Sequence, residues 1–199
     1  FLNYRNAEFM KYNLLTELKR PSVDFAYMTG HGTSTLQMIN GYPVSSAPQP
    51  SMANVARYLR SKMLAAKESN RDTFKVKEDF KKSLGLSDKW FEDAFDANAI
   101  KADSIYNINL DVQIDDLKDA NIQAKLVYLN SCLTGSFHLD DYIAGYYPFS
   151  KNQNIVAIAN SVGVLQDLWP SELMGLLGNG YRVGNWLKQI GRASCRERV

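Results

Sequence analysis

The sequence predicts an α/β fold built on a mostly parallel β-sheet. Three short apolar runs, each containing β-branched or aromatic residues and followed by a turn signal, predict buried strands; they are residues 23–28, 124–129 and 155–159. Two of these runs are nearly continuous in apolar character, as the central strands of parallel sheets are. Helical patterns lie between and after the runs, so strands and helices alternate along the chain.

The helical patterns have recognisable start and stop signals. A first helix is expected over residues 4–18, ending before Pro21. Ser51 is expected to cap a second helix. One face of that helix carries the apolar residues Met52, Val55, Ala56, Leu59 and Met63. A shorter helix over residues 76–84 should end at Gly85.

Two further serines predict helix starts nearer the C-terminus. Ser87 is expected to cap a helix that carries Trp90, Phe91, Ala94 and Phe95. Ser171 is expected to cap a final helix through Leu177, with a second helical segment over residues 183–188.

The middle of the chain differs in composition from the rest. Residues 40–49 are rich in Pro, Gly and Ser and predict a linker. After them, residues 57–82 carry nine Lys or Arg against four Asp or Glu, whereas residues 88–119 carry three against nine. This polarised helical region is either a pair of solvated arms attracted by charge or an insertion for substrate recognition or regulation.

Length and composition exclude several classes of protein. The 199 residues are 45% hydrophobic and 22% charged, which suits a folded domain and not a disordered chain. No window holds 18 uninterrupted apolar residues, so no membrane segment is expected. A net charge of +2 is too near balance to indicate a nucleic-acid partner, and two cysteines are not a disulfide scaffold. No cofactor and no metal are expected.

The last ten residues, 190–199, read IGRASCRERV and resemble the translation of a common sequencing adaptor. We expect them to be an artefact tail, the alternative being a basic solvated tail. Setting them aside leaves no net charge and a single cysteine, Cys132. No signal peptide is visible at Phe1, and we expect the chain to lack sequence at both ends.

Two polar segments follow predicted strands and carry nucleophilic or titratable side chains. His31 lies between Gly30 and Gly32, directly after the first strand, and Cys132 lies in the segment NSCLTG directly after the second. The carboxyl ends of parallel strands meet at one edge of a sheet, where ligands bind. The sequence therefore predicts that His31 and Cys132, 101 residues apart, lie close together. His138, only six residues after Cys132, is expected to be a surface or packing residue at the start of a helix.

This order of motifs resembles the caspase-like clan of cysteine peptidases, and within it most closely the gingipain family of secreted bacterial endopeptidases. The matching segments are FAYMTGHGTS (25–34), KLVYLNSCLTGSF (125–137), NIVAIANSVGV (154–164) and, more weakly, LLGNGYRVGNWL (176–187). The resemblance implies a three-layer α/β/α sandwich of caspase-like fold. Residues 1–189 would form the peptidase domain, with a charged helical insertion over residues 45–110.

The resemblance also implies roles for single residues. Cys132 would attack the scissile carbonyl, and His31 would act as general acid and base. The backbone N–H groups of Gly32 and Cys132 would form the oxyanion hole. A protein or peptide substrate would pair with the loop that contains Asn160, Ser161, Val162 and Gly163. A secreted, cell-surface or periplasmic protein is implied, and the oligomeric state is open.

The chain also departs from the family. Caspases place their histidine about 50 residues before the cysteine, half the gap seen here. No third catalytic residue and no residue that sets substrate specificity can be assigned, and Asp24 lies within the first strand. Two alternatives to a peptidase therefore stay open. One is a caspase-like module for interaction or adhesion without activity, and the other is a different Cys/His acyl-transfer enzyme, such as a transpeptidase or thioesterase.

Overall fold

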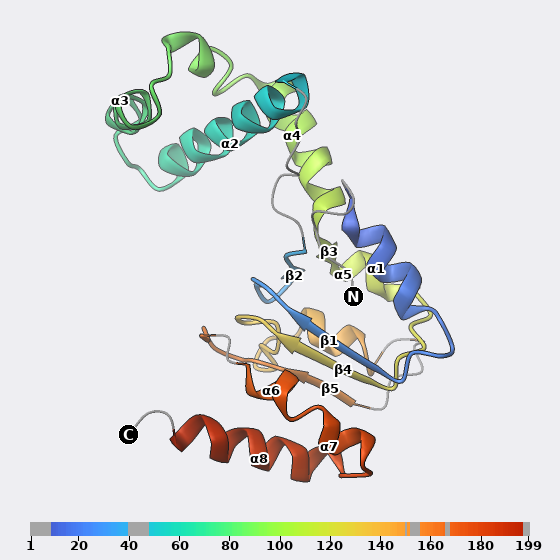
Figure 1. Ribbon diagram of the computed structural model, residues 1–199. Coiled ribbons are helices and arrows are strands. Elements are labelled where there is room, and N and C mark those ends of the chain that lie inside the picture. The colour runs from blue at the N-terminus through green and yellow to red at the C-terminus, as the bar shows by residue number, and fades with distance from the viewer. Residues whose placement is uncertain (1–8, 40–47, 150, 152–155, 166–167, 197–199) are drawn as a thin grey trace. The chain divides into compact units, whose positions relative to one another are not determined.

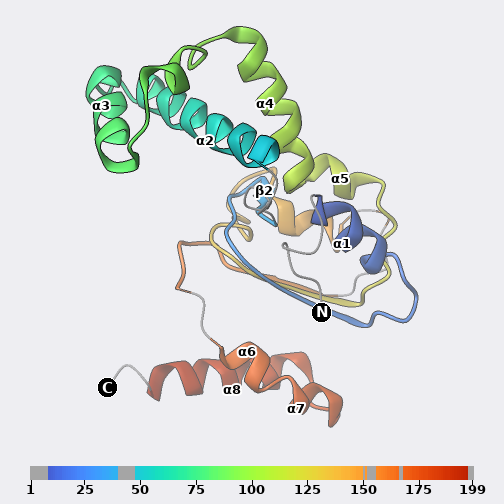
Figure 2. The same cartoon turned by 45° about the horizontal axis from the view of Figure 1, so that its top comes forward.

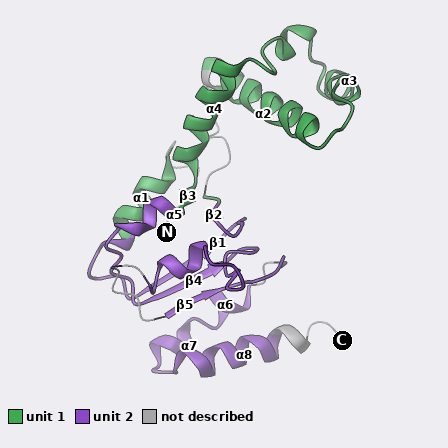
Figure 3. Ribbon diagram, turned by 180° about the vertical axis from the view of Figure 1, so that it is seen from behind, with its two compact units in different colours: residues 1–17, 38–113 green, residues 18–37, 114–199 purple. Residues whose placement is uncertain are grey.

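The computed structural model describes residues 9–39, 48–149, 151, 156–165 and 168–196. The chain divides into two compact units, coloured separately in Figure 3. Unit 1 comprises residues 1–17 and 38–113, and unit 2 comprises residues 18–37 and 114–199. Both candidate catalytic segments belong to unit 2, as does the loop after the third predicted strand.

Unit 1 is helical in the part that the structure describes. Its elements are α1 (Met10–Leu18, of which residues 10–17 belong to this unit), α2 (Pro48–Glu68), α3 (Thr73–Leu84), the 3-10 helix η2 (Asp88–Phe91), α4 (Ala97–Leu110) and the short strand β3 (Val112–Gln113). Helices α2 and α3 pack against each other (Figures 1 and 2). The core between α2 and η2 consists of Leu59, Met63, Phe91 and Ala94.

A charged cluster stands beside this core. The guanidinium of Arg60 donates two hydrogen bonds to Asp103, of 2.6 and 2.8 Å, and a third to Asp93. The hydrogen bond with Asp103 is the main cause of the raised pKa of Arg60. Arg57 lies 3.7 Å from Asp103 and stacks on the ring of Tyr106 at 3.8 Å. Opposite charges therefore do meet within the polarised region, and they do so between α2 and α4.

Three helix boundaries in unit 1 test the sequence signals. The predicted stop at Gly85 is confirmed, since Gly85 caps α3 with a φ of 66°. The predicted cap at Ser51 is wrong: α2 already begins at Pro48, and proline is well suited to a first helical turn. The helix expected after Ser87 is also wrong beyond Phe91, because only the short η2 forms there and Ser87 makes no side-chain cap.

Unit 2 is built on a parallel sheet of three strands in the order β1-β4-β5 (Figure 1). The strands are β1 (Phe25–Thr29), β4 (Leu126–Asn130) and β5 (Val156–Ala159), and all three were expected from the apolar runs. The first residue of the third run, Ile155, lies outside the described residues. Every residue of the central strand β4 is buried, which explains why its sequence is apolar without alternation.

Helices α6 (Trp169–Glu172), α7 (Gly175–Gly178) and α8 (Val183–Arg196) follow the sheet. Trp186 of α8 packs edge-on against Tyr128 of β4 and Phe25 of β1, so α8 covers one face of the sheet. Ile190, the first residue of the adaptor-like tail, belongs to the same apolar cluster. Unit 2 also contains β2 (Leu36–Gln37), α5 (Ile114–Lys118) and the 3-10 helix η3 (Ile143–Tyr146), which contacts β5.

The C-terminal helices differ from the prediction in one respect. Ser171 lies inside α6 and donates its hydroxyl to the carbonyl of Leu168, 2.8 Å away, so it does not cap a helix. The helix expected through Leu177 is divided into α6 and α7 by a turn at residues 173–174. Among the described residues, no helix combines the length and apolar character that crossing a membrane requires. The fold is thus α/β, with a small parallel sheet that positions the candidate site.

Candidate active site

The pairing of β1 with β4 places His31 and Cys132 at the same edge of the sheet. The ladder runs from Phe25 opposite Leu126 to Thr29 opposite Asn130. The backbone N–H of Gly30 then donates to the carbonyl of Asn130 over 3.4 Å. His31 and Cys132 each follow the last paired residue of their strand by two positions, and adjacent strands lie roughly 4.8 Å apart.

The segments after these two strands touch at Gly32. A β-carbon on this residue would lie 3.0 Å from the carbonyl oxygen of Cys132 and 2.6 Å from the methyl Cγ2 of Thr134. Only glycine fits such an approach, because real β-carbons are not found this close to other atoms. The glycine after His31 therefore lets its loop lie directly on the segment that carries the cysteine.

The thiol of Cys132 is half-buried and contacts the loop after β5. Its Sγ atom accepts a hydrogen bond from the N–H of Val164 at 3.3 Å, and lies 3.5 Å from the carbonyl oxygen of Val164, to which it can donate. The side chain of His31 is exposed and makes no hydrogen bond to any residue that the structure describes. The expected pair thus shares one edge of the sheet without a direct hydrogen bond between imidazole and sulfur.

Two backbone N–H groups at this edge have no acceptor among the residues that the structure describes. In the described parts of the chain, neither the N–H of Gly32 nor the N–H of Cys132 makes a hydrogen bond. Gly32 forms an isolated antiparallel bridge with Gln37, but the hydrogen bond beside it runs from the N–H of Thr33 to the carbonyl of Leu36. Backbone N–H groups left free beside a thiol are the type of donor that can bind an oxyanion.

The turn after the cysteine is held in an unusual conformation. Leu133 has a φ of 60°, in the left-handed region that non-glycine residues rarely adopt. Its N–H donates to the carbonyl of Val162 over 3.2 Å, and the N–H of Gly135 donates to the carbonyl of Asn160 over 2.9 Å. Residues held in sparsely populated conformations are enriched at active sites.

The loop expected to bind substrate lies against this turn. The carbonyls of Asn160 and Val162 and the N–H of Val164 all face the cysteine segment. Ser161 and Gly163 are the intervening residues, and neither makes a hydrogen bond within the part of the chain described. The backbone groups of Ser161 and Gly163 are therefore not engaged by any other described residue.

The side chain of Asn160 has a different partner from the one expected. Its Nδ2 atom donates to the carbonyl oxygen of Ser131 over 3.2 Å. The same oxygen accepts a hydrogen bond of 3.3 Å from the hydroxyl of Thr134. Ser131 and Thr134, both buried, were not assigned from the sequence. No signal in the sequence marks these roles, because a polar turn after a strand is an ordinary pattern.

Two other titratable residues lie away from the cysteine. His138 is exposed, as expected of a surface residue, but it lies in a turn and not at the start of a helix. Asp24 precedes β1 and forms an ion pair of 2.7 Å with Lys125, which precedes β4. Since these residues stand at the amino ends of the strands, Asp24 cannot support His31 at the carboxyl ends.

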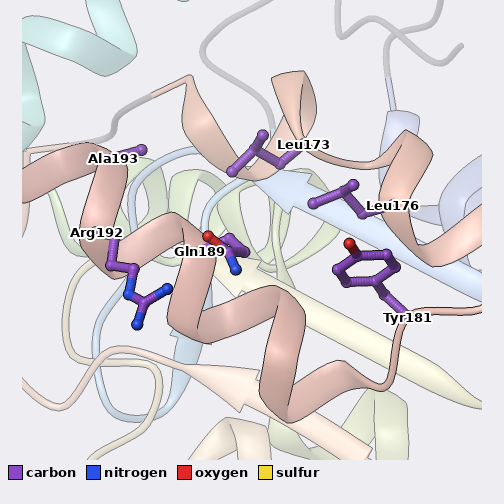
Figure 4. Close-up of a pocket in the computed structure, with 6 residues that line it drawn as sticks. All are labelled: Leu173, Leu176, Tyr181, Gln189, Arg192 and Ala193. Atoms are coloured by element: carbon purple, nitrogen blue, oxygen red, sulfur yellow. The ribbon is translucent and has the colours of Figure 1, made fainter.

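Two pockets in unit 2 are lined by residues other than His31 and Cys132. One pocket, of about 410 Å³, is lined by Leu173, Leu176, Tyr181, Gln189, Arg192 and Ala193 (Figure 4). The other, of about 560 Å³, is lined by residues of segments 118–151 that include Lys118, Tyr146 and Phe149. Within the described ranges, no three His, Cys, Asp or Glu side chains are gathered closely enough to hold a metal ion.

Comparisons with models of protein families, with curated proteins and with solved structures found no match to this chain.

Proposed function

We propose that the protein is a cysteine endopeptidase that hydrolyses peptide bonds with Cys132 as nucleophile and His31 as general acid and base. The observation that carries the proposal is the register of β1 with β4, which gives His31 and Cys132 equivalent positions beyond neighbouring strands. A caspase-like, three-layer sandwich and a secreted or cell-surface location belong to the same proposal, on the strength of the sequence resemblance alone.

The arrangement supports the following sequence of steps. The thiol of Cys132 loses its proton to His31, whose exposed side chain has no hydrogen-bond partner among the described residues and can rotate toward the sulfur. The thiolate attacks the peptide carbonyl and forms a tetrahedral intermediate whose negative oxygen is bound by the N–H groups of Gly32 and Cys132. His31 returns the proton to the leaving amine, and a water molecule then hydrolyses the thioester.

An extended peptide would pair with the open edge of the loop after β5. The backbone groups of Ser161 and Gly163 are available for it, and the exposed side chain of Val162 adds an apolar contact. Asp24 is not part of this mechanism, because its carboxylate pairs with Lys125 at the other end of the strands.

One observation favours the alternative of a module without activity. The sulfur of Cys132 is hydrogen-bonded to the backbone of Val164 and not to the imidazole of His31. A scaffold that has lost catalysis would keep this contact unchanged, whereas a peptidase must break or rearrange it when a substrate binds. A different acyl-transfer reaction would use the same residues on an ester or amine substrate.

Alkylation by iodoacetamide tests the proposal, with the rate at each cysteine measured by mass spectrometry. The full chain supplies its own reference, because Cys195 is the second thiol. We expect Cys132 in the native protein to react faster than it does in urea, and His31→Asn to remove most of that gain. His138→Asn is the matched control and should leave the rate unchanged. If native Cys132 reacts no faster than the unfolded thiol, the nucleophile is not activated and the peptidase proposal fails. Cleavage of a peptide library would then separate a peptidase from an acyl transferase.

A further inference from the structure

The carbonyl group of the peptide bond between Ser131 and Cys132 is held in place by two hydrogen bonds. The carbonyl oxygen of Ser131 accepts one hydrogen bond from Nδ2 of Asn160 at 3.2 Å and one from the hydroxyl of Thr134 at 3.3 Å. Both Ser131 and Thr134 are almost completely buried. Two donors on one carbonyl oxygen use both of its lone pairs and fix its direction.

Fixing this carbonyl also fixes the N–H of Cys132. A trans peptide unit is planar, so its C=O and N–H bonds point in opposite directions. No cis peptide bond occurs among the described residues. Since the carbonyl of Ser131 is held toward Asn160 and Thr134, the N–H of Cys132 must point away from them. That N–H is one of the two at the candidate site that have no acceptor among the described residues.

We propose that Asn160 and Thr134 are positioning residues that aim the N–H of Cys132 at the oxyanion formed during catalysis. This inference rests on the proposed function and deepens it. It also changes the role of Asn160, which the sequence placed among the residues that bind substrate. The side-chain amide of Asn160 donates a hydrogen bond to the carbonyl of Ser131, and its backbone carbonyl accepts one from the N–H of Gly135.

Thr134 supports the second oxyanion donor as well. Its methyl group occupies the position next to Gly32 where a β-carbon on residue 32 would come within 2.6 Å. The buried side chain of Thr134 therefore acts on both donors. Its hydroxyl donates to the carbonyl of Ser131, which orients the N–H of Cys132, and its methyl group packs against Gly32, which supplies the other N–H. Preorganised donors are effective because they need no reorientation when charge develops.

The chemical test compares a reaction that needs the oxyanion hole with one that does not. Acylation of Cys132 by 4-nitrophenyl acetate forms an oxyanion, and the burst of 4-nitrophenolate measures its rate. Alkylation by iodoacetamide displaces iodide at a saturated carbon and forms none. We expect Asn160→Ala and Thr134→Val to slow acylation by roughly 10- to 100-fold, somewhat less than the loss of an entire oxyanion donor. The alkylation rate of Cys132 should change less than twofold.

Matched variants separate positioning from general disruption. Thr134→Ser keeps the hydroxyl and should restore most of the acylation rate, although it lacks the methyl group. Thr29→Val makes the same chemical change as Thr134→Val at an exposed residue at the end of β1, and should leave both rates unchanged.

A second measurement, by NMR, detects the two hydrogen bonds to the carbonyl of Ser131 without any chemical reaction. Labelling serine at its carbonyl carbon with ¹³C and cysteine with ¹⁵N selects two peptide bonds in the full chain, 131–132 and 194–195. Cys195→Ser removes the second signal and assigns the first. We expect the carbonyl resonance of Ser131 to move upfield in Asn160→Ala and in Thr134→Val, and not in Thr29→Val.

The outcomes separate the two proposals. If the carbonyl resonance of Ser131 does not move in either variant, the two hydrogen bonds to this carbonyl are not present in solution. If the acylation rate is unchanged, or falls together with the alkylation rate, Asn160 and Thr134 are not positioning residues. If the wild-type protein is alkylated but never acylated by the ester or by peptides, the proposed function fails and the positioning role fails with it. The carbonyl resonance would still decide whether Asn160 and Thr134 hold the peptide.

Discussion

Gly32 lies against Thr134 so closely that a β-carbon on residue 32 would be 2.6 Å from the threonine methyl group. It would also lie 3.0 Å from the carbonyl oxygen of Cys132, which is backbone and cannot rotate away. The contact ties the segment after β1 to the segment after β4. Any side chain at residue 32 must therefore separate the two segments that carry His31 and Cys132.

We expect Gly32→Ala to lower the free energy of unfolding by about 1–3 kcal/mol, the range for overpacking a close contact. In the Thr134→Ser background the methyl group is gone, so the added β-carbon should cost less. Guanidinium unfolding of the two single variants and the double variant measures this coupling. Full additivity in this cycle would show that the two residues do not meet.

A second glycine distinguishes close packing from loop flexibility. A β-carbon on Gly135 would lie 2.9–3.0 Å from the backbone and Cβ atoms of Ala159, the last residue of β5. Gly163, in the loop after β5, has nothing within 4 Å of the same position. We expect Gly135→Ala to destabilise the protein by about 2 kcal/mol or more, and Gly163→Ala to change its stability by less than about 0.5 kcal/mol. Equal effects of the two substitutions on thermal unfolding would contradict the close approach of Gly135 to β5.

The sequence predicted the strands well because each strand is specified locally. A run of apolar residues ending in a turn signal, such as the run before Asn130, needs no knowledge of the rest of the chain. The equivalent positions of His31 and Cys132 after neighbouring strands could be predicted for the same reason, since parallel strands bring their carboxyl ends to one edge of a sheet. Helix boundaries were less predictable: the start of α2 at Pro48 and the turn between α6 and α7 depend on packing beyond the local pattern.

The hydrogen bonds around Ser131 could not be predicted. They require that Leu133 adopt a left-handed conformation, which turns Thr134 back toward the carbonyl of Ser131. They also require the third strand to bring Asn160 alongside. Neither condition leaves a signal in the residues from 130 to 135, where a polar turn after a strand is an ordinary pattern.

The burial of Tyr147 should make folding stability decrease at alkaline pH. Its side chain is completely buried and its hydroxyl donates to Oε1 of Gln37 over 3.1 Å. Burial raises the pKa of Tyr147 well above its ordinary value of 10. Below pH 10 the hydroxyl is neutral in the folded and the unfolded protein, and its contribution is fully present. Above pH 10 only the unfolded chain ionises, so folding stability should fall by about 1.4 kcal/mol for each further pH unit.

The variant Tyr147→Phe isolates this contribution from the other tyrosines and lysines. It removes the titrating hydroxyl and leaves the acceptor of Gln37 unpaired, which should cost about 1–2 kcal/mol at pH 7. We expect the difference in unfolding free energy between the wild type and the variant to be constant from pH 7 to 9. It should shrink between pH 10 and 11. A difference that stays constant through pH 11 would mean that the hydroxyl is not buried in solution.

We expect substitution of Arg60 to lower the stability of unit 1 substantially. Its bidentate hydrogen bonds to Asp103 join α2 to α4, and the side chains of both residues are nearly buried. Arg60→Met would leave the carboxylate of Asp103 with only Arg57, at 3.7 Å. We expect a loss of about 2–4 kcal/mol in guanidinium unfolding, slightly less than for a fully buried pair. Arg60→Lys keeps the charge without the bidentate geometry and should lose about half as much.

The double variant Arg60→Met with Asp103→Leu tests whether the cost arises from the uncompensated carboxylate. Apolar residues of similar volume often replace a buried ion pair with little loss, because neither charge then has to be desolvated. We therefore expect the double variant to be more stable than Arg60→Met alone, even though it carries an additional substitution. Lys62→Met on the exposed side of α2 is the control and should lie within about 0.5 kcal/mol of the wild type. If the double variant is as unstable as the sum of the two single variants, the pair stabilises unit 1 through its own attraction, and the polarised charge of this region has a direct role in folding.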